Sequence, residues 1–599
     1  MIGDLLAIFK SAYEKHGDKI VLDNYILKDG IYIRINEDKT KDILKIKAIK
    51  NKDKTIDYIS IEDRNEFTTE LFNWFKIRDY YSSLVDMNKA IDKKKKIHSN
   101  NYLAIFIKKE NLVGSEALSK VELMARLEEY YDILEKPEIK YKDKRGKDLL
   151  NTVKPDVDNL DLKIKRDFIM NNLDDIIDEI EAKKDEFDGY VKIFFADKED
   201  FKKYKLEYTR YLLPNIFNKN DYNVLLNNEI VGLSNNNMGM NSKKTYLEHK
   251  TTKFKVPYRI TSTDAMILKK FFDWLNFQPQ GSIYIPTDFK FNKSISDFKD
   301  NEVEDCHYLY ISKGKEVVIE DYEFLPRFKK TIDFTLENFL QIEEGEKENR
   351  QISPNKKINK LWELESEVDE VFFNKRLKNG YFMDPKIKDD FSKNMLNILI
   401  LSRQALYCYF KKGSSLQLIS IIDRISLDLI KDHLRRDYNL KAAKAYNLRL
   451  SLLEYFQLEG RFMGGRIKNI IETLKIKINS DDIKDLDTDE EFYFLSGQLA
   501  YFLLSKSRAN KKTHDLLEGF LKAKNASEVK KQLRYSYDRY KHAIPLDYKR
   551  FNKSLSMVLG YDVESNKKYE DVFLAGFLAK NIFYTSNKEK GDMEDEEKK

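Results

Sequence analysis

Hydrophobic and polar positions follow two different periods along this chain, and the change of period divides it into two regions. In the first half, short apolar runs and alternating runs separated by Asp-Gly and Asn-Lys-Asp turns predict β-strands. These strands are expected at residues 20–22, 30–35, 43–47, 102–107 and 190–195. The first three are expected to form an antiparallel meander. Helical spacing at 120–134 and 174–184 completes an α+β pattern.

After a charged, turn-prone stretch at 343–357, the strand pattern nearly vanishes and apolar residues recur at helical spacing. Helices are expected at 396–409, 416–434, 440–456, 490–505, 528–540 and 569–583. The predicted fold class is therefore α+β, with a mixed N-terminal part that contains an antiparallel sheet, followed by an all-α helical bundle. The predicted domains are 1–345 as a mixed region of one or two subdomains, 346–393 as a linker with connecting helices, 394–586 as the bundle, and 587–599 as a charged, disordered tail.

Composition excludes several classes of protein. The 599 residues are too many for one hydrophobic core. Cys306 and Cys408 are the two cysteines, which argues against a disulfide framework and a cysteine-based zinc site. No uncharged run approaches the roughly 18 residues of a membrane span, and residues 1–10 do not resemble a signal peptide, so we expect a cytoplasmic protein without a membrane partner.

The charge balance is close to even, with 107 Lys and Arg against 101 Asp and Glu, so only local clusters can indicate a polyanionic partner. One cluster precedes the strand expected at 102–107, where cations that can hold phosphate stand beside amides that can bond a base edge. The candidate contacts to nucleic-acid backbone are Lys93, Lys94, Lys95, Lys96, His98, Asn100 and Asn101. The alternative is an ordinary solvated turn before a strand.

A second cluster lies in the Asn-rich segment 218–252, which Gly232 and Gly239 punctuate. An Asn side chain can bond an adenine edge in two places, a Lys can hold phosphate, and a Met can wedge between base steps. The candidate duplex-reading residues are Asn235, Asn236, Asn237, Met238, Asn241, Lys243 and Lys244. The alternative is a surface loop in which Asn serves left-handed turns.

The third cluster is basic: residues 505–553 contain fourteen Lys and Arg against five Asp and Glu, with Tyr535, Tyr537 and Tyr540 interleaved. Cations beside aromatic rings suit single-stranded nucleic acid, whose backbone attracts charge and whose bases stack. The candidate single-strand contacts are Lys511, Lys512, Lys530, Lys531, Arg534, Arg539 and Lys541. A solvated helix face with tyrosines in the core is the alternative.

Evidence for catalysis is weak. The carboxylates between Asp481 and Glu490 could form the metal site of a nuclease or nucleotidyl-transfer enzyme, but they also stand where acidic residues favour a helix N-terminus. No phosphate loop or dinucleotide fingerprint occurs in the sequence. We therefore expect a protein that is not an enzyme and needs neither metal nor cofactor, with a metal-dependent nuclease as the alternative. A structural interaction protein without direct DNA contact is a third class.

Several runs resemble the large subunit of the type I-B CRISPR interference complex, Cascade. The resemblance is carried by residues 78–89, 93–101, 232–244 and 490–501, and it extends over most of the chain. It implies a non-catalytic subunit of an RNA-guided antiviral complex that recognises a short motif beside the DNA target and helps to separate the strands, while sequence matching is left to the guide RNA. It also implies that the helical C-terminal part resembles the small subunit, which holds the displaced strand.

The partners that this resemblance implies are backbone subunits bound to CRISPR RNA, the target duplex, its displaced single strand and a recruited helicase-nuclease. Gln278 and Gln280, at a predicted turn tip, are candidates for a strand-separating wedge. The codons of residues 459–463 permit a ribosome-binding sequence before Met463, so a separate small subunit, resembling residues 463–586, could be translated from the same gene.

Overall fold

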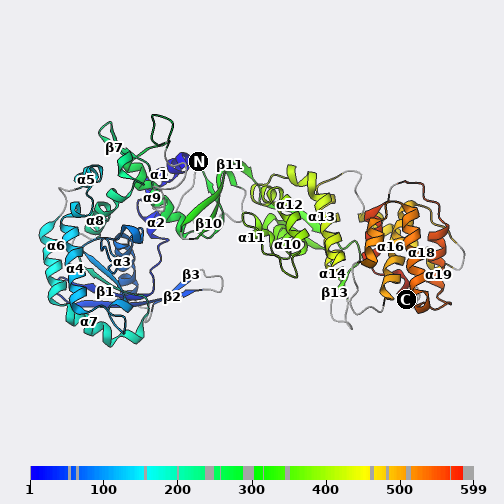
Figure 1. Ribbon diagram of the computed structural model, residues 1–599, viewed down its shortest axis with the longest axis horizontal. Coiled ribbons are helices and arrows are strands. Elements are labelled where there is room, and N and C mark those ends of the chain that lie inside the picture. The colour runs from blue at the N-terminus through cyan, green and yellow to red at the C-terminus, as the bar shows by residue number, and fades with distance from the viewer. Residues whose placement is uncertain are drawn as a thin grey trace, which may run out of the picture. The chain divides into compact units, whose positions relative to one another are not determined.

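The computed structural model of the protein describes residues 2–50, 56–61, 66–153, 158–197, 201–235, 249–256, 258–287, 303–314, 316–344, 351–458, 464–480, 484–507, 515–566 and 568–584. The chain divides into two compact units. The first unit comprises residues 1–295 and 307–324, and the second comprises 296–306 and 325–599. The first unit is α+β, whereas the second is mainly helical (Figure 1).

A five-stranded sheet forms the centre of the first unit. Its strand order is β3-β2-β1-β5-β4. Its strands are β1 (Gly30–Ile35), β2 (Lys41–Lys50), β3 (Ile56–Ile61), β4 (Ala104–Lys108) and β5 (Tyr190–Phe195). Strands β1, β2 and β3 form an antiparallel meander in which β1 and β2 are the predicted strands 30–35 and 43–47, and β3 replaces the predicted strand 20–22. Strands β1 and β5 pair in parallel. The parallel pair places β5 beside a strand that lies 160 residues earlier in the sequence, which local patterns do not predict.

Both faces of this sheet are buried. Alternate side chains of β5 point to opposite faces, so this strand shows what covers each one. On one side Val191 and Ile193 pack against residues of α4 (Lys120–Glu135), α6 (Asn159–Asn171) and α7 (Leu173–Ala182). On the other side Phe194 contacts Phe75 of α3 (Glu66–Ser82), with ring centroids 5.3 Å apart. The sheet therefore lies between two layers of helices.

A buried polar network fixes α3 against its neighbours. The Lys192 ammonium on β5 lies 2.5 Å from the Asp79 carboxylate, and both side chains are buried. The Tyr25 hydroxyl donates to the same carboxylate, and the Tyr81 hydroxyl donates to Asp18. The run at 78–81 therefore has a structural function, since buried charges are stable only when paired and hydrogen-bonded.

Further elements surround this core. The helices are α1 (Ile2–His16), α2 (Lys19–Leu22), α5 (Lys144–Asn151), α8 (Lys202–Leu212) and α9 (Ser262–Phe277). The strands are β6 (Val224–Leu226), β7 (Glu229–Gly232), β8 (Ile260–Thr261), β9 (Gly281–Pro286), β10 (Val303–Lys313) and β11 (Val317–Phe328). Strands β6, β7 and β8 form one small sheet, and β9, β10 and β11 form another.

The second unit begins within β10 and β11 rather than near residue 345, where the sequence analysis ends the mixed region. It contains two small antiparallel strand pairs, formed by β12 (Thr331–Leu336) with β15 (Lys356–Lys360) and by β13 (Glu343–Glu344) with β14 (Gln351–Ile352). Its first helices are α10 (Leu361–Phe373), α11 (Leu377–Gly380), α12 (Lys393–Lys412), α13 (Leu416–Arg435) and α14 (Asn439–Tyr455).

The remaining helices of the second unit form a bundle. They are α15 (Gly464–Asn479), α16 (Asp489–Ser505), α17 (Asp515–Lys522), α18 (Ala526–Tyr540), α19 (Lys549–Gly560) and α20 (Glu570–Leu578), followed by the short 3-10 helix η10 (Ile582–Tyr584). Helix α16 is buried on nearly all sides, because its neighbours α15, α18, α19 and α20 pack around it. All six helices expected after residue 394 are present; the ends of five agree within three residues, and the helix expected at 569–583 ends at Leu578, followed by η10.

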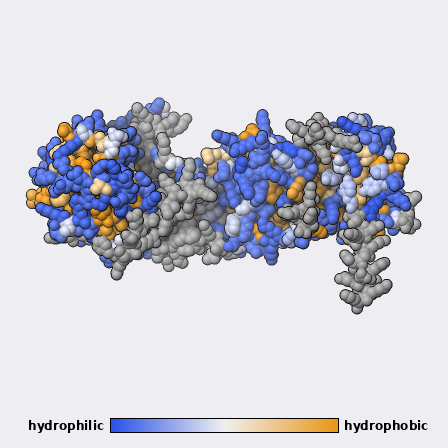
Figure 2. All heavy atoms as spheres, turned by 90° about the horizontal axis from the view of Figure 1, so that it is seen from below, coloured by the Kyte–Doolittle hydropathy of each residue, from blue (hydrophilic) through white to orange (hydrophobic). Residues whose placement is uncertain are grey.

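One predicted strand is wrong: residues 20–22 lie in α2. A run of three apolar residues fits a buried helical turn as well as a strand. Within the described part of the chain, none of the helices combines the length and the apolarity that crossing a membrane requires. Hydrophilic side chains cover most of the visible surface of both units (Figure 2).

Candidate nucleic-acid interface

A buried carboxylate organises the lysine run at 93–96. The Asp92 side chain is about 1% exposed and accepts hydrogen bonds from the backbone N–H groups of Lys94 (3.0 Å), Lys96 (2.7 Å) and Ile97 (3.1 Å). Lys95 adopts a left-handed conformation with φ of 57°. Because the buried Asp92 holds the backbone, the tight turn presents its lysines to solvent in a fixed arrangement.

The lysines of this turn differ in their surroundings. Lys93, Lys94 and Lys95 are exposed, and Lys96 is partly buried with its ammonium 2.7 Å from the Asn111 side-chain oxygen. Lys93 lies 2.8 Å from Glu129, and Lys95 donates to Asn88. Exposed pairs of this kind contribute little stability, so a phosphate can replace these partners at low cost.

His98 lies at the base of the turn and serves its structure. One ring nitrogen lies 2.9 Å from the Tyr190 hydroxyl and the other lies 2.9 Å from the Lys95 carbonyl oxygen. Burial lowers the pKa of His98, and the positive charges of Lys108 and Lys28 lower it further. The neutral ring thus connects the lysine turn to β5.

Asn100 and Asn101 are buried structural groups, where the sequence analysis expected surface contacts. Both are 0% exposed. The Asn100 amide donates to the Ser83 carbonyl (2.7 Å), and the Asn101 amide donates to the Ser82 hydroxyl (3.0 Å). These bonds attach the end of α3 to the start of β4, and a nucleic acid cannot reach either side chain in this conformation.

The predicted duplex-reading segment is described only at its start. Asn235 is 2% exposed, and its backbone N–H donates to the Ile216 carbonyl. It is therefore buried rather than presented to a duplex. The other candidates of this set lie outside the described residues: Asn236, Asn237, Met238, Asn241, Lys243 and Lys244.

The two wedge candidates lie in the turn between α9 and β9, as predicted. Gln278 is buried, and its amide donates to the Trp274 carbonyl at the end of α9 (3.1 Å), so it completes the helix rather than projecting from it. Gln280 is exposed at the tip of the turn. Of the two, only Gln280 is placed to contact a partner.

Helix α18 carries the most exposed basic surface of the predicted single-strand site. Its buried residues, Val529, Leu533, Ser536 and Tyr540, form one stripe that faces the bundle. The side chains of Lys531, Arg534, Tyr535 and Arg539 lie on the opposite side of this helix, where all four are exposed. We call these four residues the α18 ridge.

The α18 ridge combines charge with an aromatic surface. Lys531, Tyr535 and Arg539 are spaced four residues apart, so they follow one line along the helix. The Tyr535 side chain is 62% exposed. The aromatic ring between two cations can stack with a base while the cations hold the flanking phosphates.

Two other predicted cations of this region have different surroundings. The Lys530 ammonium donates to the Tyr561 carbonyl (2.5 Å) and the Leu559 carbonyl at the end of α19, so it is a helix cap and not a strand contact. Lys541 is exposed and lies 3.2 Å from Asp538. Lys511, Lys512 and Met463 lie outside the described residues.

The run at 490–501 is explained by packing. The Gln498 side chain is fully buried, its amide donates to the Gly576 carbonyl, and its oxygen accepts from the Ile582 N–H (2.9 Å). Gln498 therefore joins the end of α20 and η10 to the centre of α16. The run was part of the resemblance in the sequence, and its Gln498 has a structural role.

Three described carboxylates of the suggested nuclease site, Asp487, Asp489 and Glu490, have structural partners, and Asp485 is exposed. Asp487 and Glu491 both lie 2.6 Å from the Lys477 ammonium, and Glu490 lies 3.1 Å from Arg466. Asp489 accepts from the N–H groups of Glu564 (3.1 Å) and Ser565 (2.9 Å). Residues 481–483 lie outside the described part of the chain, in which no group of three or more metal-ligand side chains is arranged around a common point.

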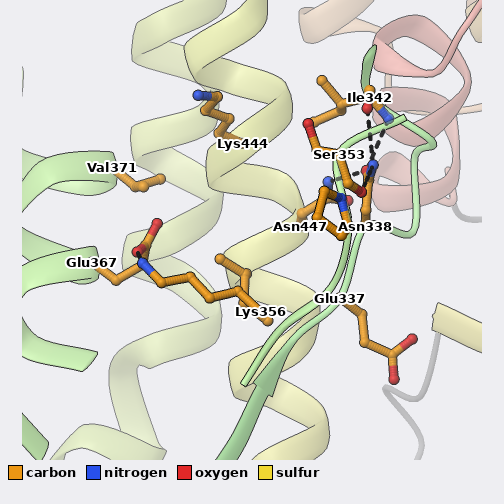
Figure 3. A pocket seen from close by; sticks show the side chains of 11 residues that line it. Glu337, Asn338, Ile342, Ser353, Lys356, Glu367, Val371, Lys444 and Asn447 are labelled. Carbon is orange, nitrogen blue, oxygen red and sulfur yellow. Dashed lines mark hydrogen bonds and ion pairs between the residues drawn. The ribbon is translucent and has the colours of Figure 1, made fainter. Parts of the chain in front are cut away.

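A cavity of about 190 Å³ opens in the second unit between the strand pair β12–β15 and helices α10 and α14 (Figure 3). Its polar wall is already hydrogen-bonded: the Asn447 amide donates to the Asn338 oxygen (2.9 Å), and the Asn338 amide donates to the Ser353 carbonyl (3.0 Å). On the other side, Lys356 lies 2.6 Å from Glu367. These bonds fix the chain around 338–353 and do not assign a ligand.

No protein-family model, curated protein or solved structure matches this chain.

Proposed function

We propose that this protein is a non-catalytic nucleic-acid-binding subunit that holds single-stranded DNA along the α18 ridge. The observation that supports this most directly is the line of Lys531, Tyr535 and Arg539 on one exposed helix face. Cations release counterions when they bind phosphates, and an exposed tyrosine stacks on any base. The ridge therefore suits a strand of any sequence.

The lysine turn at 93–96 is proposed as a second contact, to the phosphate backbone of a duplex or of a guide RNA. Its three exposed ammonium groups are presented by a backbone that Asp92 holds in place. A rigid mount lowers the entropy that binding costs. The turn has no exposed amide, so it would position nucleic acid without reading its sequence.

The wider proposal follows the resemblance in the sequence: a large subunit of an RNA-guided interference complex in which Asn236, Asn237 and Asn241 read the motif beside the target. Lys243 and Lys244 would hold its phosphates, and the exposed Gln280 would act at the point of strand separation. The partners would be backbone subunits carrying CRISPR RNA, a possible small subunit initiated at Met463, and a helicase-nuclease that cuts the target.

Fluorescence anisotropy of the full chain with a labelled oligothymidylate tests the single-strand site. Reversing three ridge charges together, with Lys531→Glu, Arg534→Glu and Arg539→Glu, is expected to weaken binding by at least tenfold. The matched control reverses three exposed cations elsewhere in the second unit, with Lys375→Glu, Lys393→Glu and Arg424→Glu. Equal losses in both triple variants would mean that only net charge matters, and the ridge proposal would then be wrong.

The wider proposal needs the assembled complex. Co-expression with CRISPR RNA and the backbone subunits should recover this chain in the purified complex. Changing Asn236, Asn237 and Asn241 to Ala should remove discrimination between motif-bearing and motif-free duplexes. A chain that never joins such a complex, or a variant complex that still discriminates, would contradict it.

A further inference from the structure

An acidic segment follows the last described element of the bundle, η10, in the sequence. Residues 592–597 read Asp-Met-Glu-Asp-Glu-Glu, which places five carboxylates within six positions. They lie outside the described residues, and the last described element before them is η10.

Aromatic contacts hold η10 next to α18. The Phe583 ring lies 6.3 Å from the Phe551 ring of α19, and the Phe551 ring lies 6.1 Å from the Tyr537 ring of α18. The Phe583 carbonyl also accepts a hydrogen bond from the Tyr548 hydroxyl (2.8 Å). One ring therefore separates the end of the described chain from α18.

The connecting residues are long enough to reach the ridge. Seven residues lie between Tyr584 and Asp592, and an extended chain of that length spans about 25 Å. Helix α18 has 15 residues, so it is about 22 Å long, with a diameter of about 10–12 Å. The linker is about as long as the helix, so the acidic run can reach the exposed face near Arg539 and extend along it.

The ridge offers this run a surface of opposite charge. Lys531, Arg534 and Arg539 are exposed, and two exposed carboxylates, Glu528 and Asp538, lie on the same side of α18. Glu528 accepts a hydrogen bond from the Lys524 N–H (2.8 Å). Asp538 already lies 3.2 Å from Lys541. A run of five carboxylates presents the same kind of charge as a short stretch of phosphates.

We propose that the acidic segment 592–597 binds the α18 ridge and competes there with single-stranded nucleic acid. This inference deepens the proposed function, because it rests on the ridge as a polyanion site. Binding of the segment is intramolecular, so its effective concentration is high even though each contact is weak. Non-specific polyanions would be excluded, while a strand delivered at high local concentration would displace the segment.

Zero-length carbodiimide cross-linking of the full chain tests the docking without any nucleic acid. A carboxylate of 592–597 is expected to form an amide with the Lys531 ammonium, identified by mass spectrometry of the digested protein. Lys531→Arg keeps the charge but cannot form the amide, so it should abolish this cross-link. The docking would be wrong if no cross-link formed at Lys531, or if Lys93 to Lys95 in the first unit were linked equally well.

Competition is tested with the tail neutralised by Asp592→Asn, Glu594→Gln, Asp595→Asn, Glu596→Gln and Glu597→Gln. Oligothymidylate should bind this variant roughly three- to tenfold more tightly than the unmodified chain at low salt. In the unmodified chain, added oligothymidylate should suppress the Lys531 cross-link. Unchanged affinity would show that the segment does not compete with the oligonucleotide, and it would not contradict the single-strand site. A Lys531 cross-link in a chain that binds no oligonucleotide would overturn the single-strand site and leave the docking standing.

Discussion

Gly497 of α16 and Gly576 of α20 face each other where the two helices cross, and neither position has room for a β-carbon. A Cβ on Gly497 would lie 2.6 Å from the Phe577 nitrogen, and one on Gly576 would lie 2.7 Å from the Phe494 carbonyl carbon. Both obstacles are backbone atoms, which cannot move without separating the helices. The paired glycines therefore set the distance between the two most closely packed helices of the bundle.

Gly576→Ala is expected to destabilise the second unit by roughly 2–3 kcal/mol or more, because an overpacked crossing must shift two backbones. Thermal unfolding followed by circular dichroism measures the effect. Gly560→Ala is the matched control: it lies at the end of α19, and a Cβ there would meet no atom within 4 Å. If both variants melted at the same temperature, the crossing would not depend on the glycines.

The helical second unit was largely predictable because its helices are long and their apolar period is strong. The strands at 30–35 and 190–195 were predictable because their apolar pattern is also strong. The parallel pairing of β1 with β5 was not, because it joins segments separated by helices α3 to α7. The division of the chain within β10 and β11 also depends on contacts between distant residues, which the local period does not report.

Asn101→Ala should lower the stability of the first unit by about 1–3 kcal/mol, because it leaves buried polar partners unsatisfied. The Asn101 oxygen accepts from the Leu103 N–H (3.0 Å), and its amide donates to Ser82. Chemical denaturation measures the loss. A fully stable Asn101→Ala variant would contradict the structural assignment of this side chain.

The exposed lysines of the neighbouring turn should behave in the opposite way. Changing Lys93, Lys94 and Lys95 to Ser is expected to leave stability within about 0.5 kcal/mol, since these are surface positions. The same change should weaken duplex binding and reduce the slope of log affinity against log salt by up to about 3. Salt titrations of duplex affinity provide this measurement, and an unchanged slope would exclude the turn as a phosphate contact.

The contrast between these neighbours shows what the sequence could reveal about the site. Lys93 to Lys96 and Asn100 to Asn101 belong to one polar run, and composition alone gives all of them the same prediction. Their burial differs because the end of α3 covers the amides, through bonds to Ser82 and Ser83 that span about twenty residues. Asp92 was missed, although an Asp directly before a polar turn is a signal for side-chain to backbone hydrogen bonds.

His433 is expected to make the second unit less stable in mild acid. It is fully buried in α13, and burial lowers the pKa of its imidazole from about 6.5 to about 4. Between these values the unfolded chain binds a proton that the folded chain does not, so stability falls as the pH falls from about 6.5 to 4. The expected loss is roughly 2–3 kcal/mol.

Other groups titrate in the same range, so the measurement is a difference between two proteins. Unfolding free energies of the unmodified chain and of His433→Leu are compared at pH 7 and pH 4.5. The variant should lose less stability on acidification than the unmodified chain does. Parallel losses in the two proteins would show that His433 does not contribute to the pH dependence.

Tyr535 and Lys531 are expected to contribute to single-strand binding in ways that salt separates. Tyr535→Ala removes the stacking surface, which is worth about 1–3 kcal/mol, so affinity for oligothymidylate should fall about tenfold or more. The salt slope should stay the same, because no phosphate contact is lost. Lys531→Ala should lower the magnitude of that slope by about 0.7, the value for one phosphate of a single strand. Tyr535→Phe keeps the ring and should bind like the unmodified chain, so a loss in Tyr535→Phe equal to that in Tyr535→Ala would show that the hydroxyl, and not stacking, makes the contact.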